Sequence, residues 1–102
     1  MRYMVELNVP VQRAQELEGD PDAPARIFGY VMERFTPDCS YNALTARKMF
    51  MVVDCDESRL CELMLTLSRM AGVNPVFTPV IATKEFGRYA GSAFEAAAKA
   101  PL

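Results

Sequence analysis

Apolar and polar residues alternate near the start of the chain. Tyr3, Val5 and Leu7 are separated by Met4, Glu6 and Asn8. A period of two predicts a β-strand with one face toward a core, and Pro10 ends it because proline cannot donate a ladder hydrogen bond. Glu6 and Asn8 are therefore expected on the face opposite the core.

Two later segments have helical periodicity. Ile27, Val31 and Phe35 recur at intervals of four, which predicts a helix between Pro24 and Pro37. Within it Gly29 either allows a close backbone approach or weakens the helix, at about 1 kcal/mol relative to alanine. A second apolar stripe lies within residues 57–71, and Gly72 is expected to end that helix in a left-handed conformation.

The remaining elements complete an alternating order. Strands are expected over residues 39–43, 47–54 and 76–82, and Pro79 favours an edge position for the last one. Residues 11–18 suit a turn or a short helix, and residues 84–99 form an amphipathic terminal helix. The order β-α-β-β-α-β predicts an α+β, ferredoxin-like antiparallel sheet with an extra C-terminal helix. The 102 residues form one domain, with a core at 1–83 and the terminal helix at 84–102.

Two helices cover only one face of such a sheet. The residues left for the other face are mostly apolar, and an apolar surface of this size usually marks an interface or a ligand site. We expect a second copy to cover it face to face, forming a dimeric α/β barrel. The alternative is that the C-terminal helix of the same chain folds across this face.

The composition of the chain argues against nucleic acid and membrane as partners. A net charge of −2 makes nucleic acid an unexpected partner, and no apolar stretch is long enough to cross a bilayer. The chain contains three cysteines without a C-x-x-C pair, and Glu6 and Asn8 interrupt the apolar run that a signal peptide needs. These features favour a cytoplasmic protein.

Candidate chemistry centres on the uncovered face. Glu6 is the candidate catalytic group, because a carboxylate near Met4 and Phe50 or Phe77 would have a raised pKa suited to acid–base work. The other interpretation is a solvated or salt-bridged edge residue. We expect the ligand-binding residues to be Asn8, Tyr41, Arg47, Phe50 and Phe77.

Arg47 and Tyr41 flank the second hairpin. Arg47 suits a carboxylate or an oxyanion, and Tyr41 can donate a hydrogen bond to an oxygen. The alternative is hairpin packing for Tyr41 and a surface charge for Arg47.

Metal and cofactor chemistry are not expected. The chain has no histidine, which removes the commonest zinc ligand and the commonest general base. Asp54, Asp56 and Glu57 lie where a helix start favours acidic residues, which explains them without a metal. The acids beside Cys55 should raise the pKa of that thiol rather than activate it.

An ordered set of short segments resembles a known family. It comprises Arg2 to Val11, then Glu33, the run Pro37 to Tyr41, Arg47, the run Val52 to Asp54, and finally Val76 to Val80. The set is similar to an uncharacterised bacterial family of small proteins that looks like a branch of the dimeric α/β-barrel superfamily. That superfamily includes muconolactone isomerase-like enzymes, small monooxygenases and binding proteins.

Some members of that family carry a pantothenate synthetase label. The genuine ligase has paired histidines for ATP, whereas this chain has neither a histidine nor a glycine-rich phosphate loop. The label therefore does not extend to this chain.

Three functions remain open from the sequence. The first is binding of a small, mostly apolar ligand in the cavity of a homodimer. The second is a cofactor-free isomerase or cyclase in which Glu6 moves a proton while Arg47 or Tyr41 holds an oxyanion. The third is a structural interaction module whose sheet face is filled by its partner.

Overall fold

The computed structural model describes residues 1–101 and shows four strands and four α-helices. The strands are β1 (Arg2–Asn8), β2 (Cys39–Asn42), β3 (Lys48–Asp54) and β4 (Val76–Val80). The helices are α1 (Val11–Glu18), α2 (Ala23–Phe35), α3 (Glu57–Ala71) and α4 (Phe86–Ala97), with a 3₁₀ turn η1 (Thr83–Glu85) before α4. Leu102, the last residue of the expected terminal segment 84–102, lies outside the described residues.

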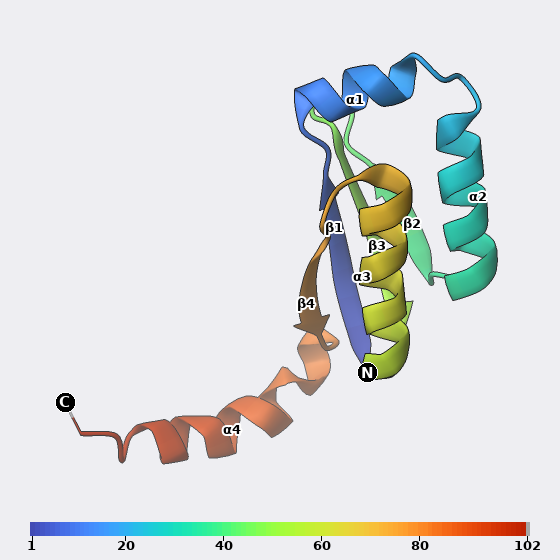
Figure 1. Cartoon of the computed structure of the whole chain (residues 1–102). Coiled ribbons are helices and arrows are strands. Elements are labelled where there is room, and N and C mark those ends of the chain that lie inside the picture. The colour runs from blue at the N-terminus through green and yellow to red at the C-terminus, as the bar shows by residue number, and fades with distance from the viewer. Residues whose placement is uncertain (102) are drawn as a thin grey trace.

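The four strands form one open antiparallel sheet. Their order is β2-β3-β1-β4, and α2 and α3 cover one face of it (Figure 1). The fold is α+β and compatible with the predicted ferredoxin-like arrangement. Strand β4 lies at an edge of the sheet, as Pro79 predicts.

The core lies between the sheet and the two helices. Alternate residues of the central strands point into it, so Val5 and Leu7 of β1 and Met51 and Val53 of β3 are almost fully buried. The predicted helix stripes supply the other side, including Ile27 and Val31 from α2 and Leu63 and Leu67 from α3. This confirms the predicted inward face of β1.

The ends of the long helices follow their local sequence. Asp56 caps α3, because its side chain accepts a hydrogen bond from the Arg59 amide at 2.8 Å. Gly72 ends α3 with φ at 72°, as predicted. Asp22 occupies the corresponding position before α2 but accepts no capping hydrogen bond through its side chain. Thr36 ends α2 in the left-handed region, with φ at 42°.

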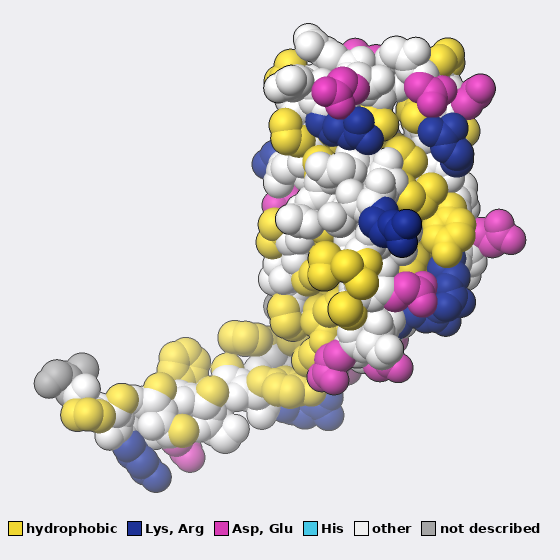
Figure 2. Space-filling view, viewed as in Figure 1, with side chains coloured by type: hydrophobic (Ala, Val, Ile, Leu, Met, Phe, Trp, Pro, Cys, Tyr) yellow, Lys and Arg dark blue, Asp and Glu magenta, His cyan; other side chains and the backbone are white. Residues whose placement is uncertain are grey.

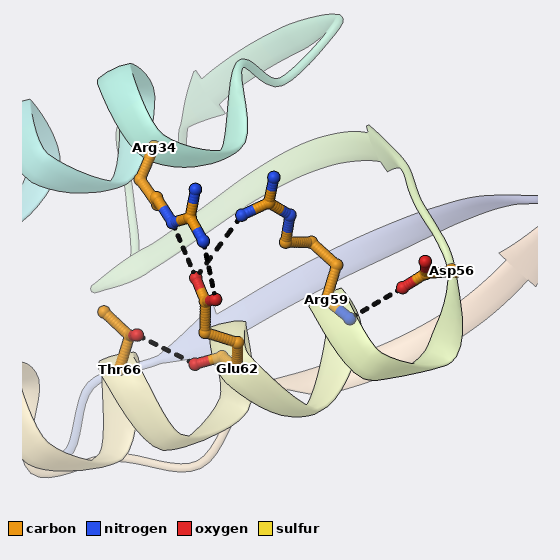
Figure 3. Close-up of polar contacts among 5 residues, drawn as sticks. All are labelled: Arg34, Asp56, Arg59, Glu62 and Thr66. Carbon is orange, nitrogen blue, oxygen red and sulfur yellow. Dashed lines mark hydrogen bonds and ion pairs between the residues drawn. The ribbon is translucent and has the colours of Figure 1, made fainter.

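An ion pair joins α2 to α3 on the outer surface of the helical layer. Arg34 donates from Nε and Nη2 to the two carboxylate oxygens of Glu62, each at 2.9 Å (Figure 3). Arg59 approaches the same carboxylate at 3.8 Å. The hydrogen bonds from Arg34 hold the pKa of Glu62 below its usual value and raise the pKa of Arg34.

The terminal helix α4 does not fold across the sheet. It extends away from the body as an arm (Figure 1), and none of its residues is buried. The Cα radius of gyration is 17.0 Å, whereas a compact chain of this length has about 13 Å. The alternative in which the terminal helix covers its own sheet is therefore not the arrangement seen.

No helix among residues 1–101 is both long enough and apolar enough to span a membrane.

Candidate functional site

The uncovered face of the sheet forms the candidate site, which we call the open face. The strand register places Met4 opposite Val52, and Glu6 opposite Phe50. The next strand adds Tyr41 beside Phe50. The remaining members are Arg2 and Asn8 from β1, Cys39 from β2, Lys48 and Asp54 from β3, and Val76, Thr78 and Val80 from β4.

Apolar side chains dominate the middle of the open face. Met4 and Val76 are exposed, Phe50 and Val52 are half-buried, and Tyr41 is 67% exposed. No helix among residues 1–101 lies over them, because α2 and α3 pack on the other side. The face therefore presents hydrophobic surface to whatever lies above it.

Glu6 lies within this apolar surface but has a cationic neighbour. Lys48 Nζ approaches Glu6 Oε1 at 3.7 Å, and the Glu6 side chain is 30% exposed. This ion pair fits the second interpretation of Glu6, a salt-bridged residue, and differs from a carboxylate with apolar neighbours alone. Glu6 and Lys48 instead give the open face one acceptor and one donor side by side.

Two other predicted ligand residues share this face. Asn8 lies opposite Lys48 at the end of β1, and Tyr41 lies opposite Phe50, which in turn lies opposite Glu6. The structure therefore brings Glu6, Asn8, Tyr41 and Phe50 to one side of the sheet.

Phe77 lies on the opposite side of the sheet. It pairs with Val5 and packs against the core. Its neighbour Val76 takes the position beside Glu6. Both faces of β4 carry apolar residues, so the sequence did not decide whether Phe50 or Phe77 would lie near Glu6. Of these two, the structure places Phe50 beside Glu6.

Arg47 is also separated from the predicted cluster. It directly precedes β3, its carbonyl accepts a hydrogen bond from the Val9 amide at 2.9 Å, and its guanidinium pairs with Glu18 at the end of α1. Arg47 therefore joins α1 to the second hairpin and is not brought to Glu6.

A hollow of about 500 Å³ lies where the arm leaves the sheet. Its size falls within the roughly 300–1,000 Å³ of ligand pockets. Its lining is mostly apolar and consists of Met1, Arg2, Asp54, Pro79, Val80, Ile81, Phe86 and Tyr89. Arg2, Asp54 and Val80 belong to the open face, so the hollow continues that face toward the arm.

The charges around this hollow are paired. Arg2 Nε lies 3.1 Å from Asp38 and 3.9 Å from Asp54, and the N-terminal amine lies 3.2 Å from Asp54. Because these charges neutralise one another, the hollow presents an apolar wall rather than a free ionic site.

Sequence reasoning did not assign Phe86 and Tyr89 to a site. Their aromatic character was visible in the terminal helix, but nothing local shows that this helix starts on the open side of the sheet.

Cys55 and Asp56, at the start of α3, have structural roles rather than features of a reactive or metal-binding site. Burial raises the pKa of the Cys55 thiol, and the neighbouring Asp56 acts in the same direction. Asp56 serves as the α3 cap. Across residues 1–101, no group of three or more His, Cys, Asp or Glu side chains is arranged to hold a metal ion.

A scan against protein-family models found no match to this chain. A search of curated proteins likewise found no significant match.

Proposed function

We propose that this protein is a homodimer that binds a small, mostly apolar ligand over the open face of its sheet. In this proposal two open faces oppose each other, as in a dimeric α/β barrel, and the ligand occupies the space between them. The observation that carries the proposal is an uncovered apolar face that continues into a hollow of about 500 Å³. Contiguous apolar surface of this kind is rarely left in water.

The polar groups on the face define the chemistry of the ligand. Glu6 offers an acceptor, Lys48 a donor, and Tyr41 a hydroxyl that does both. They lie among Met4, Phe50 and Val52. A fitting ligand has an apolar body with a neutral hydrogen-bonding group at one end, because the paired Glu6 and Lys48 leave no unpaired charge for an ion.

Native mass spectrometry of the protein purified from its own host tests this proposal. We expect the mass of two chains together with a retained small molecule, which organic extraction then releases for identification. Ions that contain only protein, from material that also fails to bind the neutral apolar fluorophore Nile red, would contradict ligand binding.

A matched pair of variants locates the binding surface. Met4 on the open face and Leu65 on α3 are exposed to similar extents, 41% and 51%. Met4→Gln should reduce fluorophore or ligand affinity by about tenfold through lost apolar contact, whereas Leu65→Gln should leave it unchanged. Equal effects of the two substitutions would place the ligand elsewhere.

A further inference from the structure

The arm helix α4 carries an apolar stripe that the other residues within 1–101 leave largely exposed. We define the arm stripe by the residues that line a shallow hollow along this helix: Phe86, Tyr89, Ala90, Ala93, Phe94 and Ala97. The three aromatic members are 57%, 56% and 73% exposed. Figure 2 shows hydrophobic side chains spread along the arm, well away from the body.

A helix of this kind needs a partner. Isolated helices shorter than about 12–15 residues are marginal in water, and most helical stability in proteins comes from packing an amphipathic face. Helix α4 has 12 residues. Gly87 and Gly91 weaken it further, by about 1 kcal/mol each relative to alanine. The helix is therefore stable only where its stripe is packed.

The arm leaves its own chain on the open side of the sheet. At its root, Phe86 and Tyr89 line the hollow together with the open-face residues Arg2 and Val80. Beyond the root, α4 runs past the edge of the sheet (Figure 1), and the longest dimension of the molecule reaches 54 Å. A molecule seated over the open face would lie beside the arm.

We propose that the arm is exchanged in the homodimer, so that the stripe of each α4 packs on the open side of the second copy. Each protomer thus both donates an arm and receives one. This inference rests on the dimer proposed above and adds that the partner's arm closes the ligand cavity, with Phe86 and Tyr89 in its wall.

The exposed area supports a second copy as the occupant. At about 200 Å² per aromatic side chain, the exposed parts of Phe86, Tyr89 and Phe94 amount to roughly 370 Å². On the open face, Met4, Tyr41 and Val76 are 41%, 67% and 52% exposed and add a comparable area. Burying both surfaces in both protomers removes roughly 1,400 Å² from water, within the range of about 1,200–2,000 Å² typical of stable interfaces.

The charges also fit this occupant. The arm stripe has no charged member. On the open face, Glu6 is paired with Lys48, and Arg2 is paired with Asp38 and Asp54. The charged residues of α4, Arg88 and Glu95, lie outside the stripe. The stripe can therefore pack on the open side of the second copy without leaving an unpaired charge buried beneath it.

Sedimentation equilibrium of the full chain with two aspartate substitutions tests the exchange. Phe94→Asp places a carboxylate in the stripe, whereas Ser92→Asp places one on the same helix outside it. We expect Phe94→Asp to raise the dimer Kd about a hundredfold, because two identical arms each lose about tenfold. Ser92→Asp should change the Kd by less than about threefold.

The body should stay folded in both variants, because α4 contributes no buried residue to it. The thermal midpoint by circular dichroism checks this. Gly91→Ala gives an independent test in the opposite direction. Outside the backbone of its own helix, no atom lies within 4 Å of a Cβ built at Gly91. The substitution should therefore strengthen each of the two exchanged helices by about threefold to fivefold and lower the dimer Kd by roughly tenfold to 25-fold.

The outcomes separate this inference from ligand binding. A wild-type dimer that Phe94→Asp leaves intact would overturn the arm exchange while keeping the dimer. A wild-type single chain would overturn both the exchange and the dimer, and fluorophore binding would still decide ligand binding separately. A dimer weakened by Phe94→Asp but not by Ser92→Asp supports the exchange.

Discussion

Gly29 and Gly72 differ in whether the structure requires a glycine at their position, although both lie next to apolar helix residues. A Cβ built at Gly29 in α2 meets no atom within 4 Å, whereas one at Gly72 meets Arg13 Nε at 2.8 Å, and Gly72 has φ at 72°. Gly29 therefore only weakens its helix, while Gly72 is required by the backbone and by Arg13, which donates to the Ala71 carbonyl at 2.7 Å.

These positions give opposite predictions for alanine. Gly29→Ala should raise the free energy of unfolding by about 0.5–1 kcal/mol. Gly72→Ala should lower it by at least about 1 kcal/mol, since alanine resists a left-handed conformation. Urea unfolding followed by circular dichroism measures both. A loss of stability in Gly29→Ala would mean that α2 packs against a neighbour at that position.

The cysteines should differ in reactivity. Cys61 is exposed on α3, whereas Cys55 is partly covered and burial raises the pKa of its thiol. Because the thiolate is the reactive form, Cys61 should be alkylated by iodoacetamide at pH 7.5 well before Cys55. Peptide mass spectrometry over a time course measures the order in which the two cysteines are alkylated. The variant Cys61→Ser checks that the fast label is on Cys61. Faster labelling of Cys55 would contradict the packing around β3 and α3.

At the scale of elements, local patterns predict the order of strands and helices well. The alternation around Val5 and Leu7 predicts the inward face of β1, and Pro79 and Gly72 predict an edge strand and a helix end. These features depend on neighbours in sequence, which is why pattern alone recovers them.

Other features depend on residues far apart in the chain. Phe77 and Val76 are both apolar, so only pairing with β1 decides which one lies beside Glu6. Arg47 finds its partner Glu18 in a different element, 29 residues away. The direction of α4 has no local signal, because an amphipathic helix fits any apolar surface equally well.

The pair between α2 and α3 predicts a pH dependence of stability. The hydrogen bonds from Arg34 lower the pKa of Glu62 from its ordinary value of 4.5. The unfolded chain then binds a proton at Glu62 more readily than the folded chain does. The stabilisation is therefore fully present above pH 4.5 and is lost as the pH falls through the lower folded pKa.

Glu62→Gln removes this titration. We expect the variant to lose less stability than the wild type between pH 5 and pH 3, with Glu95→Gln on the arm as a control. Chemical denaturation at each pH measures the slopes, and the effect should be small because the pair is exposed to solvent. Identical slopes for Glu62→Gln and the wild type would show that the pair does not hold in solution.

At the scale of the whole molecule, one chain has two uncovered apolar surfaces, the open face and the arm stripe. The body buries its core between the sheet and two helices, yet the radius of gyration exceeds that of a compact chain of this length. In the proposed dimer the two open faces oppose each other and each arm stripe packs on the open side of the partner. One symmetric arrangement would then cover both surfaces.

The mass of the protein in dilute solution tests this account most directly. Light scattering coupled to size-exclusion chromatography, at micromolar concentrations and physiological salt, should give twice the chain mass of 11.4 kDa. A mass of 11.4 kDa for a folded, monodisperse chain would contradict the claim that a second copy covers the open face.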